Sequence, residues 1–266
     1  MKRIGFIGCG NMAQAMIKGI YETDDDKQVN MIASNPTKEK LQRMKQLYDV
    51  DTAKSNLDVV NQSDFIILAV KPQKYEKILT EIREDLTVEK IVGSIAAGKT
   101  IGEIEEQVGN DKKIVRIMPN TPVAIGEGMS IVASNQNVTN EEFNEVQNIL
   151  SAFGKVCPLD EDQFDAATAL SGSSPAMVYV FIEAMADAGV KMGLPRDTAY
   201  ELAAQAVVGS GKMVRDLKEN PAVLKDKVCS PGGTTIEMIT ALEREGFRNA
   251  VIQGVVQAAE KSQKMR

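Results

Sequence analysis

The chain has 266 residues, of which 43% are hydrophobic and 26% are charged, and this is the composition of a soluble globular protein long enough for two domains. Its 31 basic and 37 acidic residues give a formal net charge of −6 without a long basic run, which argues against nucleic-acid and anionic-membrane partners. No apolar run is long enough to span a membrane, and we expect no signal or transit peptide because the sequence opens directly on a strand pattern.

The first predicted strand, residues 3–7, leads into a glycine-rich turn and a helical pattern. Gly8, Gly10 and Ala13 have G-x-G-x-x-A spacing. Gly8 permits a tight turn, Gly10 lets a pyrophosphate approach the backbone, and Ala13 lets the helix pack close to the strand. The N–H groups at the helix start would face the phosphates. We predict a dinucleotide site here; the alternative is a glycine-rich turn that binds nothing.

The second predicted strand indicates which dinucleotide binds. An NAD site usually has an acid at the end of this strand to hold the ribose 2′-hydroxyl, but no acid lies between Val29 and Lys38. Donor side chains stand there instead, namely Ser34, Asn35, Thr37 and Lys38. These suit a 2′-phosphate, so we predict NADP(H). The alternative is an ordinary turn with a solvated lysine.

Strand and helix patterns alternate up to about residue 160. The strand patterns cover residues 3–8, 29–33, 64–70, 90–95, 114–118, 128–133 and 154–157. The helical patterns include residues 12–21, 38–47, 75–86, 100–108 and 141–153. Residues 65–70 are continuously apolar, and residues 90–97 are apolar apart from Lys90 and Ser94, as expected for strands buried on both faces of a parallel sheet. The prediction is a doubly wound, Rossmann-type α/β domain over residues 1–160.

Residues 161–266 give only helical patterns and predict an all-α domain. Three prolines suit the first turn of a helix and two residues suit N-caps, namely Pro175, Pro195 and Pro221, with Ser174 and Asn220 as the caps. Residues 175–190 are apolar around most of the helix circumference, so we expect them to be buried on all sides. Such a small domain needs a second copy to complete its core, which predicts an obligate dimer.

Loops after the strands would meet at the carboxyl edge of the sheet, where open α/β sheets bind ligands. Ala69, Val70, Lys71 and Pro72 would lie along the cofactor, and the small Ala96 and Ala97 would leave room for a nicotinamide. The alternatives are a solvated lysine and alanines that pack a helix start. Asn120 and Thr121, between two prolines, form either a cleft wall or a structured loop.

A second polar cluster, residues 230–235, combines two glycines with two threonines at a predicted helix start. Its N–H groups and hydroxyls could bind a carboxylate without arginine, or one threonine could simply cap the helix. The segment 170–176 is equally ambiguous. The chain has no histidine, so any chemistry must use other side chains, water or the substrate's own proton. Cys9, Cys157 and Cys229 fit reduced thiols of a cytoplasmic protein rather than a disulfide or metal site.

Eight segments together resemble the Δ1-pyrroline-5-carboxylate reductase family over essentially the whole chain. They occur in the order GFIGCGNMA, AVKPQ, SIAAG, RIMPNTP, ALSGSSPA, DAGVKMGLPR, LKDKVCSPGGTT and ALEREGFR. The resemblance implies reduction of the C=N bond of 1-pyrroline-5-carboxylate to L-proline by NADPH, or by NADH, in the last step of proline biosynthesis. It also implies a homodimer through the helical domain, with each site built from both chains, and a decamer in several members.

The resemblance also implies roles for individual residues. Together with Asn35, the cofactor contacts would be Ile7, Gly8, Gly10, Asn11, Met12, Ser34, Asn56, Ala69, Val70, Lys71, Pro72, Ala96 and Ala97. The substrate carboxylate would contact Ser230, Gly233, Thr234 and Thr235, with Ser174 closing the pocket where the family usually has glycine. We expect Thr235 to orient the ring nitrogen, because the cyclic imine can bring its own proton.

Two other functions remain open at this point. One is an NADP-dependent reductase of another cyclic imine or of a β-hydroxyacid, for which Lys191 and Lys212 are catalytic candidates by position only. The other is a non-catalytic NADP-binding redox sensor. A carboxylate site at residues 230–235 would favour a reductase, since a sensor does not need one.

Overall fold

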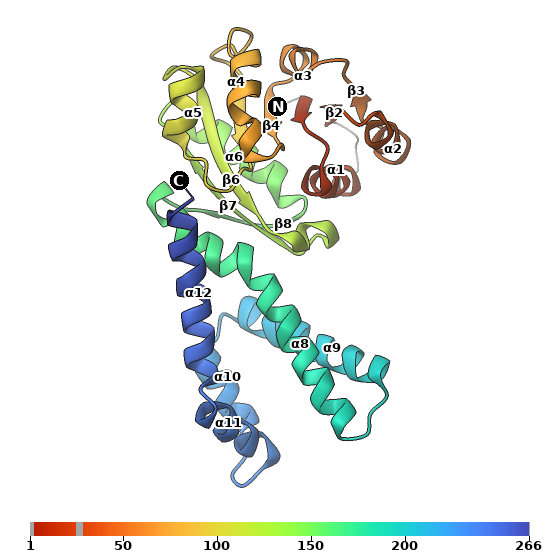
Figure 1. Cartoon of the computed structure of the whole chain (residues 1–266), viewed down its shortest axis with the longest axis vertical. Helices are drawn as coiled ribbons and strands as arrows, with labels where there is room; N and C mark the ends of the chain where they lie inside the picture. Colours follow the sequence, from red (N-terminus) through yellow and green to blue (C-terminus); the bar gives the residue numbers. More distant parts are fainter. Residues whose placement is uncertain (1–2, 25–28, 266) are drawn as a thin grey trace. The chain divides into compact units, whose positions relative to one another are not determined.

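The structure is a computed structural model that describes residues 3–24 and 29–265 (Figure 1). It divides into two compact units, which are described separately. The first contains the chain before Ser173 together with the residues from Ala258 onward, and the second is Ser173–Gln257. The second compact unit thus begins at Ser173, twelve residues after the predicted start of the helical domain at residue 161. The predicted domain boundary at residue 160 stays a prediction.

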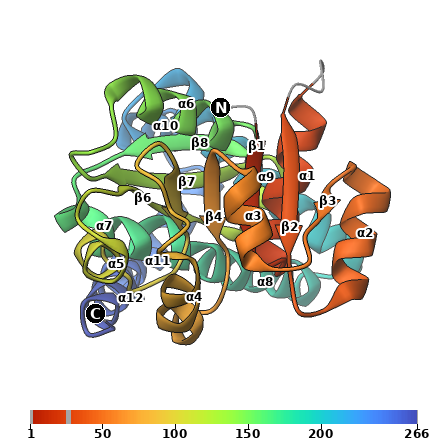
Figure 2. The same ribbon diagram turned by 90° about the horizontal axis from the view of Figure 1, so that it is seen from above.

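The first unit is built on an eight-stranded sheet in the order β3-β2-β1-β4-β5-β6-β7-β8. The strands are β1 (Arg3–Ile7), β2 (Asn30–Ser34), β3 (Asp51–Thr52), β4 (Phe65–Leu68), β5 (Ile91–Ser94), β6 (Lys113–Pro119), β7 (Gly128–Ser134) and β8 (Gly154–Pro158). The β6–β7 pair is antiparallel and the other neighbours are parallel. β1 and β4 are parallel neighbours (Figure 2), and the order in which strands are added to the sheet reverses between them: β2 and β3 lie beyond β1, and β5 to β8 lie beyond β4. This switch point is where doubly wound sheets bind ligands.

Alternate residues of the central strands face opposite sides of the sheet. In β4, Phe65 and Ile67 belong to one buried cluster, while Ile66 and Leu68 belong to the other. Successive strand side chains point to opposite faces, so a strand covered on both faces must be apolar throughout. This explains why the apolar runs predicted these strands.

Helices cover both faces of the sheet. They are α1 (Asn11–Thr23), α2 (Lys38–Tyr48), α3 (Asn56–Gln62), α4 (Tyr75–Ile82), α5 (Ile101–Val108), α6 (Asn140–Ser151) and α7 (Phe164–Ala167), with short 3-10 turns at Pro72–Lys74, Thr121–Ile125 and Glu161–Gln163. Buried residues of α1, α2 and α6 share one cluster, and those of α3, α4 and α5 share the other. The sequence pattern did not predict β3 or α3, and the helix predicted over residues 75–86 ends at Ile82.

The second unit is helical, as predicted. Its elements are α8 (Ser174–Lys191), α9 (Arg196–Leu217), α10 (Pro221–Val228), α11 (Thr234–Arg244) and α12 (Phe247–Gln263), whose last turns belong to the first unit. Asn220 caps α10 by accepting the N–H of Ala222 at 2.9 Å, which confirms that cap. The predicted cap at Ser174 is wrong, because a π-helical turn, Thr168–Ser173, continues directly into α8.

Within one chain, α8 is not buried on all sides, and its full burial, which a second copy would have to complete, stays a prediction. Ala186 is its one buried residue, while Tyr179 and Val180 are 60% and 64% exposed. Soluble proteins seldom expose contiguous large apolar side chains unless a partner covers them. None of the helices in the described part of the chain has the length and hydrophobicity that a membrane crossing requires.

Candidate active site

The glycine turn has the geometry that the motif predicts. Gly8 has φ of +98°, and a Cβ there would lie 2.6 Å from the Ala69 carbonyl oxygen. Gly10 faces open space, with no atom within 4 Å of its Cβ position. Gly10 is also the N-cap of α1 and supplies no side-chain cap. The first N–H groups of α1 therefore remain available to an anion.

Backbone hydrogen bonds bring the ends of three strands to this turn. The Gly8 N–H donates to the Ser34 carbonyl, and the Ala69 N–H donates to the Ile7 carbonyl, both at 2.9 Å. The Cys9 N–H donates to Asn35 Oδ1 at 3.1 Å. The predicted cofactor residues at the ends of β1, β2 and β4 thus lie together at the carboxyl edge of the sheet.

The end of β2 carries a chain of side-chain hydrogen bonds. The buried Ser34 hydroxyl donates to Asn56 Oδ1 at 2.7 Å, and Asn56 Nδ2 donates to Glu81 Oε2 at 2.9 Å. Asn35 is engaged as well, since its Nδ2 donates to the Thr37 carbonyl at 3.2 Å. Asn35 therefore positions the glycine turn. Sequence reasoning missed Glu81, for which the sequence offers no local signal.

A buried tyrosine joins the ends of β4 and β5. The Tyr75 hydroxyl donates to the Leu68 carbonyl at 2.8 Å and lies 3.0 Å from Ser94 Oγ. Burial raises the pKa of Tyr75, so it remains a neutral donor. Ser94 Oγ in turn accepts the Ala96 N–H at 3.5 Å. These contacts shape the loop that carries Ala96, which is buried, and Ala97, which is half-buried.

Beside β4, the predicted cofactor residues differ in exposure. Ala69, Val70 and Pro72 are half-buried, and Lys71 is exposed just before the 3-10 turn. Asn11 is exposed and Met12 half-buried at the start of α1.

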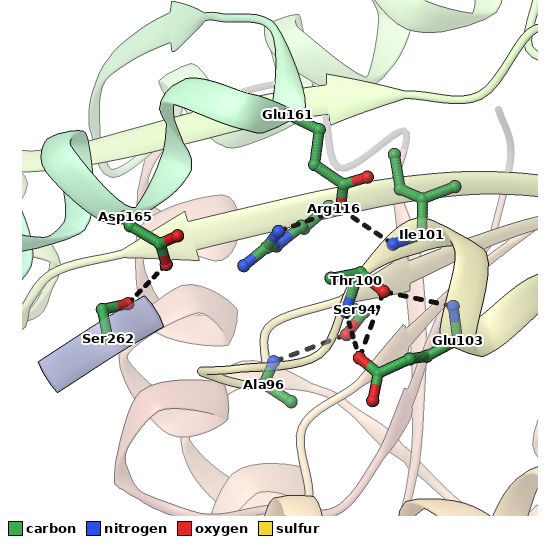
Figure 3. A network of polar contacts seen from close by, with 9 residues as sticks. All are labelled: Ser94, Ala96, Thr100, Ile101, Glu103, Arg116, Glu161, Asp165 and Ser262. Atoms are coloured by element: carbon green, nitrogen blue, oxygen red, sulfur yellow. Dashed lines mark hydrogen bonds and ion pairs between the residues drawn. The ribbon is translucent and has the colours of Figure 1, made fainter. Parts of the chain in front are cut away.

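A polar network joins the start of α5 to β6 (Figure 3). Glu161 Oε1 accepts the Ile101 N–H at 2.8 Å and the Arg116 guanidinium at 2.9 Å. Arg116 is only 4% exposed and stacks over the Phe164 ring, 4.5 Å from its centroid. A buried arginine is stable when paired and hydrogen-bonded in this way. The start of α5 is therefore fixed to β6.

The end of α12 contacts the same loop region. The Ser262 hydroxyl donates to the buried Asp165 at 2.7 Å (Figure 3). Gly98 has φ of +75°, and its Cβ position lies 3.0 Å from the Met265 carbonyl oxygen. The last residues of the described chain thus lie against the loop that contains Ala96 and Ala97.

The loop with Asn120 and Thr121 is held in place by the Asn120 side chain. Asn120 Oδ1 accepts the Met129 N–H at 2.9 Å, and Asn120 Nδ2 donates to the Ser171 carbonyl at 3.0 Å. The Asn120 side chain is thus committed to holding this loop together.

In the second unit, the 230–235 cluster forms a turn at the start of α11. The Gly233 N–H donates to the Ser230 carbonyl at 3.0 Å, and Gly233 is the N-cap without a side-chain cap. Among the described residues, nothing hydrogen-bonds to the hydroxyls of Thr234 or Thr235. Neither threonine is therefore the N-cap, and this helix start can accept an anion. Ser174 is half-buried at the first residue of α8.

Comparison with known proteins decides the family. A family model described as pyrroline-5-carboxylate reductase dimerisation matches residues 161–265, and one described as NADP oxidoreductase, coenzyme F420-dependent, matches residues 3–98. The pyrroline-5-carboxylate reductase of Escherichia coli (strain K12) is 44% identical over 264 residues, which cover 99% of this chain and 98% of the relative. The chain belongs to the pyrroline-5-carboxylate reductase family.

Solved structures of the family share the fold of the whole chain. A pyrroline carboxylate reductase from Plasmodium falciparum, with NADP bound, has a TM-score of 0.87 at 36% identity and covers 99% of this chain and 97% of its own. The pyrroline-5-carboxylate reductase from Coxiella burnetii has a TM-score of 0.92 at 33% identity, and the match covers 98% of this chain and 97% of the Coxiella chain. The predicted family and the predicted order, a Rossmann-type domain followed by a helical domain, are confirmed.

Proposed function

We propose that this chain reduces 1-pyrroline-5-carboxylate to L-proline by hydride transfer from NADPH, the last step of proline biosynthesis. The match to the E. coli reductase along nearly the whole of both chains carries the proposal. The site geometry agrees with it, because the chain offers a glycine turn suited to a dinucleotide and a helix start suited to a carboxylate.

The cofactor would lie along the carboxyl edge of the sheet, and the solved P. falciparum relative has NADP bound. We assign the pyrophosphate to Gly8, Gly10 and the first N–H groups of α1, supported by the open space at Gly10. The 2′-phosphate would lie near Ser34 and Asn56, and the nicotinamide near Ala96 and Ala97. Ile7, Asn11, Met12, Asn35 and the 69–72 segment would complete the site.

The substrate carboxylate would bind the start of α11, through Ser230, Gly233, Thr234 and Thr235. The support is a helix start whose threonine hydroxyls have no other partner among the described residues. A carboxylate there gains from backbone donors and from the helix dipole, so no arginine is needed. Ser174 would close the pocket.

The mechanism needs no histidine. NADPH, when bound, supplies the hydride. A cyclic imine can carry its own proton, so the chain's task is to hold the imine carbon in line with the cofactor. The Thr235 hydroxyl would hydrogen-bond the ring nitrogen and orient the ring; with a pKa far above neutral, it is a poor free acid.

The active form would be a homodimer through the helical unit. The family model for this half is named for dimerisation, and α8 exposes large apolar side chains in a single subunit. A decamer of such dimers is the finer proposal, drawn from the resemblance alone. We further propose a cytoplasmic location, where the free thiols of Cys9, Cys157 and Cys229 would stay reduced.

The deciding experiment follows NADPH oxidation by absorbance with 1-pyrroline-5-carboxylate, and then repeats the assay with NADH. We expect rapid turnover that depends on the imine, with proline as the product and a higher kcat/KM for NADPH. Intact NADPH binding without turnover would contradict the proposal and favour a redox sensor. Turnover only with another imine would favour a related reductase.

A further inference from the structure

The side-chain hydrogen bonds at the end of β2 finish at an acid from a different element. Ser34 donates to Asn56 Oδ1, and Asn56 Nδ2 donates to Glu81 Oε2 on α4. Glu81 is exposed. Within the described part of the chain, no lysine or arginine forms an ion pair with Glu81, so its negative charge has no cationic partner.

This position matters because of where β2 ends. In a doubly wound sheet, the residue at the end of the second strand faces the ribose 2′ position of the dinucleotide. Ser34 is that residue, and the N–H of the turn residue Gly8 donates to its carbonyl at 2.9 Å. The acid that an NAD site usually places on β2 is absent here. The carboxylate of Glu81 is nevertheless connected to Ser34 through a single intervening side chain, that of Asn56.

We propose that Glu81 is a cofactor-selectivity residue, whose carboxylate on the Asn56 amide disfavours a 2′-phosphate and thereby keeps NADH usable beside NADPH. The inference rests on the proposed function for the placement of the cofactor. A phosphate carries up to two negative charges near Ser34, whereas the NADH ribose carries none there. Repulsion from Glu81 therefore acts on one cofactor and leaves the other nearly unaffected.

Other charges lie near Glu81 along the chain, and the exposed Lys77 precedes it by one turn on α4 without forming an ion pair with it. Asp58, the acid nearest in sequence to Asn56, accepts the backbone N–H groups of Lys54 and Ser55. Lys38 and Lys40 are exposed in the first turn of α2, the helix that follows β2 in the chain. These lysines attract a 2′-phosphate and Glu81 opposes them, so the observed preference would be their balance.

The test compares Glu81→Gln with wild type, using kcat/KM and directly measured Kd for NADPH and NADH. Glutamine keeps an acceptor for Asn56 and removes only the charge. We expect Kd and KM for NADPH to fall about two- to tenfold, with a much smaller change for NADH. The gain should shrink in high salt, because an exposed charge is screened.

Glu76→Gln is the matched control, since Glu76 is also an exposed acid on α4. It should leave the NADPH-to-NADH ratio unchanged. Equal changes for both cofactors in Glu81→Gln, or an equal gain in Glu76→Gln, would overturn the proposal. Because Kd needs no turnover, a selective gain in NADPH affinity supports the role of Glu81 even if the imine proves not to be the substrate.

Discussion

At the residue scale, two glycines of one motif have different physical roles. Gly8 is held at φ of +98° with its Cβ position 2.6 Å from a carbonyl oxygen, while Gly10 faces open space. A side chain at Gly8 therefore strains the fold, whereas one at Gly10 enters open space, where we propose that the cofactor binds. The sequence motif requires glycine at both positions, and only the structure shows that Gly8 is needed for the backbone turn whereas Gly10 leaves open space.

We predict that Gly8→Ala lowers the free energy of unfolding by about 1–3 kcal/mol, since it combines a positive φ with a clash. Gly10→Ala should leave unfolding nearly unchanged and weaken NADPH binding. Denaturant unfolding and NADPH titration of both variants check this. Equal destabilisation by the two substitutions would contradict the assignment.

A second residue prediction concerns Thr235. Thr235→Ala should lower kcat/KM for the imine roughly ten- to a thousand-fold, the scale of one lost oriented hydrogen bond in a site. NADPH affinity should be unchanged. Thr235→Ser keeps the hydroxyl and should retain most activity. Near-full activity of the alanine variant would refute the orienting role.

At the element scale, the start of α5 depends on a capping box. Thr100 accepts the Glu103 N–H, and Glu103 accepts the Thr100 N–H at 2.8 Å (Figure 3). Burial raises the pKa of Glu103, but hydrogen bonds from Thr100 and Lys99 outweigh it and hold the pKa below its usual value. The carboxylate therefore stabilises the folded chain above its unfolded-state pKa, and this contribution is lost as the pH falls through the lower folded-state pKa.

Glu103→Gln should accordingly lower the unfolding free energy by up to about 1 kcal/mol at neutral pH, because glutamine keeps the cap acceptor but loses the negative charge at the helix start. In acid, once the wild-type carboxyl is protonated, the difference should disappear. Urea unfolding of both proteins across this pH range measures it. A difference that persists or grows in acid would show that the carboxylate is not the stabilising group.

At the scale of the whole molecule, the end of α12 belongs to the first unit although the rest of the helical half does not. The Ser262–Asp165 hydrogen bond, 2.7 Å long, makes this attachment. We predict that Ser262→Ala lowers unfolding free energy by about 1–2 kcal/mol, as for a hydrogen bond to a charged group. Hydrogen exchange should become faster in residues 96–98, and Ser262→Thr should restore protection. Unchanged hydrogen exchange in residues 96–98 of Ser262→Ala would show that the end of α12 does not stabilise this loop.

The second prediction at this scale concerns assembly. Val180→Lys puts a charge on the α8 face that is exposed in one subunit, and we expect it to dissociate the dimer, because burying an unpaired charge is costly. Ile125→Lys, which changes an exposed apolar residue of the first unit, should leave the dimer intact. Light scattering after size-exclusion chromatography distinguishes the two. A dimeric Val180→Lys variant would place the interface elsewhere.

The sequence by itself was enough for features encoded over a few neighbouring residues. Alternation of apolar strands and helices predicted the sheet, the Gly8–Ala13 spacing predicted a tight glycine turn between a strand and a helix, and Asn220 predicted a cap, because backbone sterics and local hydrogen bonds specify each one. The short β3 and α3 gave too little periodicity to be found, and Ser174 failed as a cap because the helix before it continues.

Only the tertiary structure decided which distant side chains meet. Glu81 reaches Asn56 across 25 positions, and Ser262 reaches Asp165 across 97. No periodic signal connects such residues, because their approach depends on how the helices pack on the sheet. The same reason applies to α8, which is apolar around most of its circumference yet exposes large side chains in a single chain. We propose that a second subunit supplies the surface that buries them.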